Sequence, residues 1–172
     1  MSRFWPHTAY AEDQPYSHSI LWVHVLTRAI STGTVVGTGI TSTSYLLRQF
    51  KILSPSPLSS TFTGTLLRSQ GVGAVVATGL LVVGLPVRMA GRTEIEWQDR
   101  SWRLLENKWQ VECDDWTYAG MAGGAMMAAR RGGQWGWKGR AGIVGAGSLV
   151  GMLGYMGWRY GVKGGKFEEE KL

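Results

Sequence analysis

Four largely uncharged stretches alternate with charged or proline-containing segments along the chain. They cover residues 29–47, 69–87, about 116–130 and 141–158. A helix that crosses the hydrocarbon core of a bilayer needs roughly 17–25 mostly apolar residues. The third stretch is short, and Arg130 and Arg131 at its end are expected to extend it by reaching toward the membrane surface. The pattern predicts an all-α membrane protein with four transmembrane helices, and whether the third stretch crosses fully stays open.

The segments between these stretches suggest an arm, two hairpins, a charged segment and a tail. We expect a polar N-terminal arm (1–19), a first helical hairpin (20–88), a charged interfacial segment (89–115), a second hairpin (116–160) and a polar tail (161–172). Helical spacing in the charged segment places Trp102, Leu105 and Trp109 on one face. This predicts an amphipathic helix around 94–111 that lies on the membrane, with a solvated charged helix as the alternative. The arm either docks on a neighbour or is disordered.

Small residues at four-residue spacing recur in all four stretches. In water each glycine costs a helix about 1 kcal/mol relative to alanine, whereas in lipid the helix keeps its backbone hydrogen bonds. Small side chains then let helix backbones approach closely. For 141–158, a buried glycine-rich loop or a soluble core helix is the alternative. The expected helix-packing residues are Gly33, Gly37, Gly73, Ala77, Gly120, Gly124, Gly147, Gly151 and Gly154.

A faint internal repeat supports two similar Gly-rich hairpins. Arg68, Gly73, Ala74 and Gly79 recur 72 residues later as Arg140, Gly145, Ala146 and Gly151. The Gly33–Gly37 pair opens the first hairpin much as the Gly120–Gly124 pair opens the second. We therefore expect the two hairpins to pack through equivalent small residues.

Charge and aromatic residues predict how the helices lie in the membrane. The segment 48–68 carries three basic residues and no acid, and 130–140 carries four and no acid. The positive-inside rule places these two loops on one side and both termini on the other. Nine tryptophans lie mostly near the ends of apolar segments. The expected interfacial anchors are Trp97, Trp102, Trp109, Trp158 and Tyr160.

No constellation of catalytic, cofactor-binding or metal-binding residues is recognisable. Cys113 is the single cysteine, and His24 is one of three scattered histidines without an acidic residue at ligand spacing. The four stretches lack the ionisable residues that a pump or channel places in its spans. The net charge of +6 lies at segment ends rather than in a patch with exposed aromatics, so nucleic acid is not an expected partner. The remaining function is assembly through helix packing.

Two resemblances give this expectation a context. Short Gly-rich spans with the Gly33/Gly37, Gly120/Gly124 and Gly147/Gly151 pairs resemble the inner-membrane protein-translocase channel family and its mitochondrial relatives over about residues 28–160. The chain lacks the acidic and asparagine residues that usually follow the basic loop of that family. The arm, with Pro6-His7-Thr8-Ala9-Tyr10 followed by Asp13-Gln14-Pro15-Tyr16, resembles the start of a fungal accessory subunit of mitochondrial complex I.

The second resemblance implies a multi-pass protein of the mitochondrial inner membrane with both termini in the intermembrane space. It implies a non-catalytic accessory subunit without a cofactor, which stabilises the membrane arm of NADH:ubiquinone oxidoreductase. Its expected partners are core and accessory membrane-arm subunits, with phospholipids at the basic loops. The alternative is a component of an inner-membrane protein translocase, and an organelle-shaping tether is a third reading.

Overall fold

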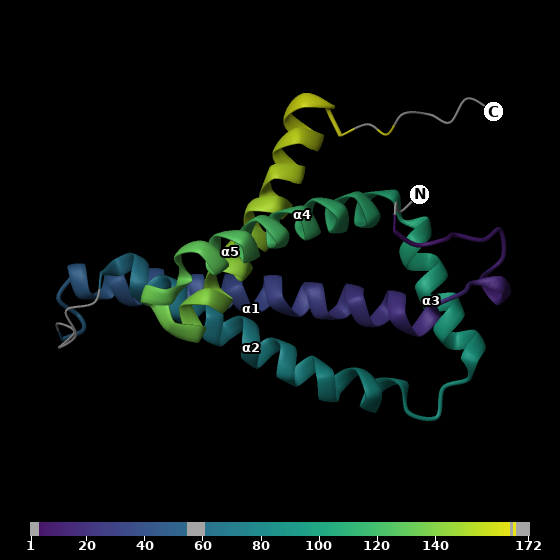
Figure 1. Cartoon of the computed structure of the whole chain (residues 1–172), viewed down its shortest axis with the longest axis horizontal. Coiled ribbons are helices and arrows are strands. Elements are labelled where there is room, and N and C mark those ends of the chain that lie inside the picture. The colour runs from purple at the N-terminus through teal and green to yellow at the C-terminus, as the bar shows by residue number, and fades with distance from the viewer. Residues whose placement is uncertain (1–3, 55–60, 166, 168–172) are drawn as a thin grey trace.

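Within the described residues, five α-helices pack together in two pairs (Figure 1). The computed structural model describes residues 4–54, 61–165 and 167, and all regular structure within these residues is helical. The helices are a short η1 (Ala11–Asp13), α1 (Ser17–Gln49), α2 (Phe62–Met89), α3 (Glu94–Glu106), α4 (Lys108–Arg131), η2 (Gly132–Trp135), α5 (Gly136–Met156) and a π-helical turn η3 (Gly157–Val162). Half of the polar tail predicted for 161–172 and part of the basic loop at 48–68 lie outside the described residues.

Three helical segments are long and apolar enough to cross a membrane. They are α1, α2 and the segment Gly133–Val162, which contains α5. The fourth predicted span, about 116–130, belongs to α4, a helix that begins eight residues earlier because no proline or glycine interrupts 108–115. These added turns carry Glu112, Asp114 and Asp115. The all-helical prediction is therefore confirmed for the described residues, which contain three candidate membrane spans, and the fourth predicted span stays a prediction.

The charged segment contains a shorter helix than the sequence predicts. We expected one helix around 94–111, but α3 ends at Glu106 and the backbone of Asn107 is extended (ψ 90°). The side-chain oxygen of Asn107 accepts a hydrogen bond from the backbone N–H of Gln110 at 3.2 Å. Asparagine favours this capping position because it satisfies an N–H that the helix itself leaves unpaired. Residues 108–111 thus begin α4 instead of ending α3.

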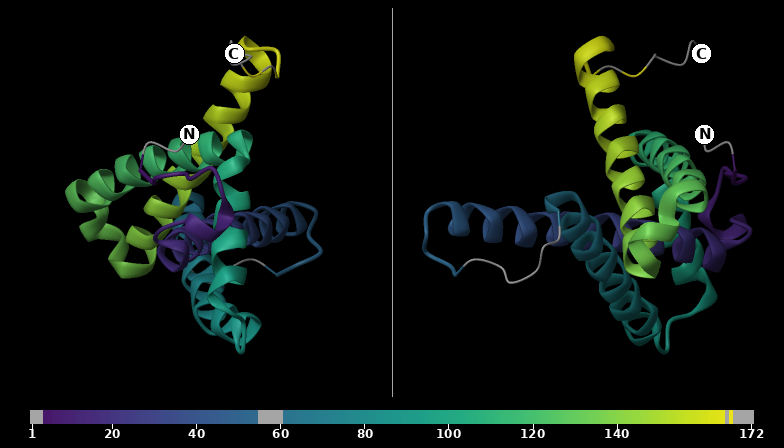
Figure 2. Two further views of the ribbon diagram at one scale, coloured as in Figure 1. Left: turned by 90° about the vertical axis from the view of Figure 1, so that its right-hand side faces the viewer. Right: turned by 60° about the vertical axis from the view of Figure 1, so that its left-hand side comes forward.

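The helices form two hairpins that pack against each other through their inner members. Helix α1 packs on α2, α4 packs on α5, and α2 packs on α5, which gives the packing order α1–α2–α5–α4. Both connections within the hairpins lie at one end of the molecule, whereas α3 and the N-terminal arm lie at the other (Figure 1). The end of α5 and η3 extend beyond the crossing with α4 (Figure 2). The two basic connections therefore lie toward the same end of the long axis, away from α3.

The N-terminal arm docks on α3 of its own chain. The indole Nε1 of Trp102 donates to the carbonyl oxygen of Thr8 at 2.9 Å, and the His7 ring stacks on Trp102 with centroids 5.6 Å apart. Gln14, which is 2% exposed, donates to the carbonyl oxygen of Pro6 at 2.9 Å. Trp5 packs against a small apolar core of Ile20, Leu105 and Val111. The described part of the arm, from residue 4, is thus ordered, and α1 begins at Ser17, three residues before the predicted start of the hairpin.

The start of α1 is tied to the start of α3 through Glu94. Ser17 Oγ donates to Glu94 at 2.9 Å, and His18 Nε2 lies 2.8 Å from the second carboxylate oxygen. The His18 ring also stacks on Trp97 with centroids 4.0 Å apart. Hydrogen bonds from His18 and then from Ser17 hold the pKa of Glu94 below its ordinary value of 4.5. Ionised Glu94 therefore favours the docked position of α3.

We expect this junction to loosen in acid. Because the folded-state pKa of Glu94 is lowered, its contribution is complete above pH 4.5 and is lost as the pH falls through the folded pKa. Hydrogen–deuterium exchange in 94–100 should show more protection in the wild type than in Glu94→Gln at neutral pH. The two proteins should exchange alike below the folded pKa. A difference that persists undiminished in acid would contradict the role of this carboxylate.

Candidate functional site

The first hairpin is closed by direct contact between the α1 and α2 backbones. A methyl group added at Gly33 would overlap the carbonyl oxygen of Gly73, and one at Gly37 would overlap that of Ser69. Ala74 also lies against Gly33, whereas the predicted packing residue Ala77 is half-buried. Backbone contact of this kind is the structural use of small residues in membrane helices.

The second hairpin repeats this arrangement. A methyl group at Gly120 would overlap the carbonyl oxygen of Gly147, and one at Gly124 would come within 2.7 Å of the carbonyl oxygen of Ile143. Gly120 and Gly124 on α4 lie 87 residues after Gly33 and Gly37 on α1. Their partners on α5, Gly147 and Ile143, lie 74 residues after Gly73 and Ser69, the corresponding partners on α2. The offset between α2 and α5 is thus two residues longer than the 72 predicted from the sequence repeat.

The last two predicted packing glycines lie against Trp116. Gly151 packs on its backbone, with no room for a methyl group beside the carbonyl oxygen. A methyl group at Gly154 would lie 3.5 Å from its indole ring, an ordinary van der Waals distance. The contact at Gly151 therefore has stricter steric requirements than the contact at Gly154.

The two hairpins dock through a further pair of glycines. A methyl group at Gly71 on α2 would overlap the carbonyl oxygen of Lys138, and one at Gly142 on α5 would overlap that of Leu67. Gly145 lies against the hydroxyl group of Thr34 on α1. Neither Gly71 nor Gly142 was predicted as a packing residue, because neither belongs to the four-residue spacings that identified the others.

Hydroxyl and amide groups add hydrogen bonds between the helices. Ser31 Oγ on α1 donates to Ser148 Oγ on α5 at 3.2 Å, with both residues buried. Gln70 Nε2 donates to Thr38 Oγ1 at 2.9 Å, and Ser69 Oγ donates to the carbonyl oxygen of Gly37 at 3.0 Å. Ser31 and Thr38 of α1 thus bond to neighbouring helices, whereas Thr27 and Thr34 donate to carbonyl oxygens one turn earlier in α1, and both kinds of bond lower the cost of burying these hydroxyl groups.

Two ion pairs fix the first turns of α4 between α1 and η3. We refer to His24, Arg28, Glu112, Asp114 and Arg159 as the charged clamp. Arg28 Nη2 donates to Asp114, and His24 Nδ1 lies 2.7 Å from the other oxygen of that carboxylate. Arg159 Nη2 donates to Glu112 at 2.6 Å and is 4% exposed. The Asp114 side chain is 9% exposed, so its charge depends on these partners rather than on water.

The clamp was not recognised in the sequence. His24 was interpreted as a histidine without an acidic partner, and Arg28 only as the residue bounding a span. The two residues share a helix face, four positions apart. Asp114 is 86 and 90 residues away from them along the chain. The four-residue spacing was a usable signal, but the carboxylate could be found only once α1 and α4 were placed together.

The space beside the His24–Asp114 pair of the clamp is small. A cavity of about 20 Å³ adjoins His24, Asp114 and Tyr118 and is otherwise lined largely by Trp5 and apolar residues. This volume holds about one water molecule. Within the described residues, no group of three His, Cys, Asp or Glu side chains is arranged around a common metal position. The geometry of the clamp therefore suits the joining of helices.

The predicted interfacial anchors have neighbours within the chain. Trp97 stacks on His18, Trp102 bonds to the arm, and Trp109 meets Tyr155 edge-on with centroids 6.0 Å apart. Trp158 lies against Trp116 with centroids 5.8 Å apart, whereas Tyr160 is 58% exposed. Their position at a membrane surface stays a prediction.

The chain matches no protein-family model and no curated protein at a significant level. Its function is therefore inferred from the sequence and from the contacts described above.

Proposed function

We propose that this protein is a non-catalytic accessory subunit that stabilises the membrane arm of mitochondrial NADH:ubiquinone oxidoreductase. The resemblance of the N-terminal arm supports the choice of complex, and the helix contacts support a packing role. In this proposal the protein lies in the inner membrane with both termini in the intermembrane space. It carries no cofactor.

The main observation that supports this proposal is the pairing of the buried charges. Asp114 and Arg159 are the charged residues that are buried within the described parts of the chain, and each has an oppositely charged partner from another helical segment. A catalytic or transport site would leave such groups directed at a substrate or an ion path. Here they join α1, α4 and η3, which favours assembly.

The outer surface of α2 supports a role in contacting neighbours. Of the 18 residues in the most apolar part of α2, only 17% are buried within the chain. Val76, Leu80, Val83 and Val87 are between 55% and 71% exposed. The second half of α2 also diverges from α1 beyond their crossing (Figure 1). We propose that membrane-arm subunits and lipid acyl chains cover this face of α2.

We also propose that α4 is the fourth membrane span. Its 24 residues correspond to roughly 36 Å of helix, which is long enough for a hydrocarbon core of about 30 Å. The clamp neutralises Glu112 and Asp114 near its N-terminal end. Four spans would place both termini on one side and the two basic connections on the other.

A translocase component is the second candidate. Such a protein would direct a small-residue face toward a hydrated groove, whereas Gly33, Gly73, Gly120 and Gly147 lie against helix backbones. This contact favours assembly over translocation, and the experiment below separates the two functions.

The proposed function is tested by native electrophoresis of gently solubilised fungal mitochondria with an in-gel NADH-dehydrogenase stain. We expect the tagged protein to migrate with the stained band, and deletion of its gene to shrink or remove that band. Gly151→Leu should reduce the amount of complex without changing the turnover of what remains, because the leucine would overlap the backbone of Trp116.

The matched control is Gly161→Leu, since a methyl group at Gly161 meets nothing within 4 Å. It should leave the band unchanged. Migration with a smaller assembly, and an unaltered stained band after deletion, would contradict the complex I proposal and favour the translocase alternative.

A further inference from the structure

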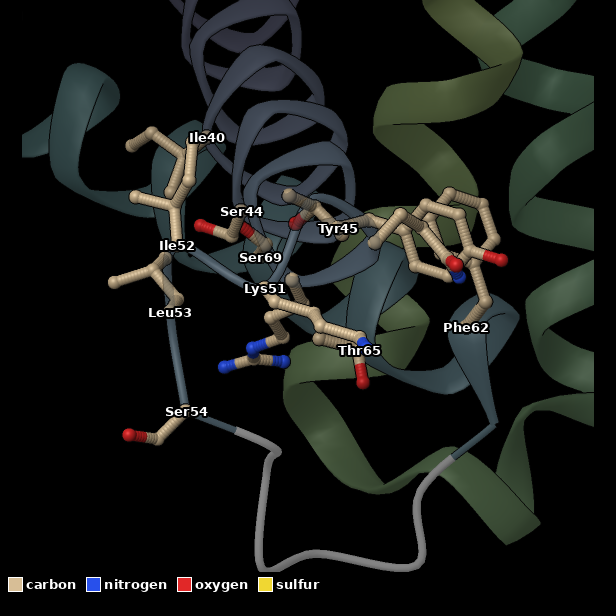
Figure 3. A pocket seen from close by; sticks show the side chains of 13 residues that line it. Ile40, Ser44, Tyr45, Lys51, Ile52, Leu53, Ser54, Phe62, Thr65 and Ser69 are labelled. Carbon is tan, nitrogen blue, oxygen red and sulfur yellow. The ribbon is translucent and has the colours of Figure 1, made fainter.

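A pocket of about 860 Å³ lies where α1 ends and α2 begins. Its lining comes from the last turns of α1, from the return at 51–54 and from the first turns of α2 (Figure 3). Hydroxyl groups of Ser44, Ser69 and Thr65 line its centre, with Lys51 beside them (Figure 3). The pocket belongs neither to the charged clamp nor to the glycine contacts between the hairpins.

The charge of the pocket is entirely positive. Among the described residues that line it, Arg48 and Lys51 are basic and none is acidic. Both side chains belong to exposed residues, and neither forms an ion pair with a described residue. Two cations without an ion pair among the described residues, beside the Ser44 hydroxyl group, form a complement to a phosphate group.

The walls of the pocket are apolar. Ile40, Ile52 and Leu53 lie on one side, and Tyr45 and Phe62 lie on the other (Figure 3). Ile40 and Ile52 are 60% and 68% exposed. The Tyr45 and Phe62 rings meet edge-on with centroids 5.0 Å apart. A free phosphate ion would leave these walls in water, whereas an acyl chain would cover them.

The backbone at Lys51 brings these groups together. Lys51 has φ 57°, in the left-handed region where glycine is the usual residue at a helix end. Its N–H donates to the carbonyl oxygen of Arg48 at 3.0 Å, and the N–H of Ile52 donates to that of Leu47 at 2.9 Å. This hydrogen-bond pattern is a Schellman motif, and it folds Ile52 and Leu53 back beside α1. Lysine is less stable than glycine in this backbone conformation, but it places an ammonium group at the pocket.

We propose that this pocket binds an anionic phospholipid. The phosphate lies between Arg48 and Lys51, and an acyl chain lies along Ile40, Ile52 and Leu53. Basic pockets between membrane helices suit this class of lipid, because the charge holds the headgroup while the bilayer supplies the chains. The inference requires a membrane-embedded chain but no particular complex, so it can fail or succeed independently of the proposed function.

The test uses the full-length chain purified in an uncharged detergent. Dioleoylphosphatidylglycerol is titrated against dioleoylphosphatidylcholine and against inorganic phosphate, with thermal unfolding and native mass spectrometry as readouts. Phosphatidylglycerol should raise the melting temperature and remain bound as one retained molecule. Phosphatidylcholine and inorganic phosphate should do neither.

Lys51→Gly separates lipid binding from folding. Glycine suits the left-handed backbone, so the lipid-free variant should melt at or above the wild-type temperature. Its affinity for phosphatidylglycerol should fall about fivefold, as expected for one lost charge near a lipid phosphate. Arg48→Gln should weaken binding similarly. The control is Arg68→Gln, an exposed basic residue of α2 outside the lining, and it should bind like the wild type.

Two outcomes would overturn the proposal. One is full retention of phosphatidylglycerol binding by the combined Arg48→Gln and Lys51→Gly variant. The other is an equal response to phosphatidylcholine or to inorganic phosphate, which would indicate a general lipid effect or a simple anion site.

Discussion

Replacing Gly142 with leucine is expected to separate the two helical hairpins. A side chain at this position would overlap the backbone of Leu67, and neither the α2 nor the α5 backbone can give way without moving its helix. Overpacking of a closed interface typically costs 1–3 kcal/mol, and the cost is larger here because the obstacle is backbone rather than a mobile side chain. Cysteine crosslinking between α2 and α5 in native membranes should be lost, while crosslinking between α1 and α2 persists.

The matched control for this variant is Gly79→Leu on α2. A methyl group at Gly79 meets nothing within 4 Å, and leucine favours the helix over glycine by roughly 0.8–1 kcal/mol. This variant should keep both crosslinks and fold at least as well as the wild type. Equal damage from Gly142→Leu and Gly79→Leu would show that added volume, and not the docking contact, is responsible.

Replacing Asp114 with leucine is expected to release α4 from α1. Arg28 and His24 would then be left beside an apolar side chain in a partly buried site, and breaking a buried pair on one side costs roughly 3–5 kcal/mol. The Arg28 side chain is 25% exposed, which places the expected loss toward the lower end of that range. Thermal unfolding in detergent, together with protease access to 108–115, would measure it.

A second substitution distinguishes the ion pair from general disruption of α4. Arg28→Leu combined with Asp114→Leu removes both charges, and replacing a buried pair with apolar residues is often nearly neutral. The double variant should therefore be more stable than Asp114→Leu alone. A double variant as unstable as the sum of the two single variants would mean that the charges do not act as a pair.

Three apolar helices long enough to be membrane spans could be predicted from the sequence, but the ends of the helices could not. Charged residues bound an apolar stretch without ending the helix, so α4 continues through Glu112 and Asp114. Membrane crossing was inferred from hydropathy, whereas helix formation depends on the backbone and on capping. Asn107, which separates α3 from α4, is a capping signal that the helical pattern concealed.

The packing glycines, like the helices, could be predicted only in part. Spacing alone identified Gly33 and Gly120, because a pair on one helix face is visible within a single stretch. The docking contacts at Gly71 and Gly142 join different hairpins, so their importance follows only from which faces meet. The same limit applies to the charged clamp. Little in the sequence distinguishes its residues, which are brought together only by the approach of α1, α4 and η3.

The packing order α1–α2–α5–α4 has a consequence for synthesis of the chain. The least apolar of the long helices, α4, packs chiefly on α5, which follows it in the sequence. A helix that begins with several acidic residues does not partition into lipid by itself. In the proposed four-span arrangement, α4 would therefore enter the membrane together with α5, after α5 has been synthesised.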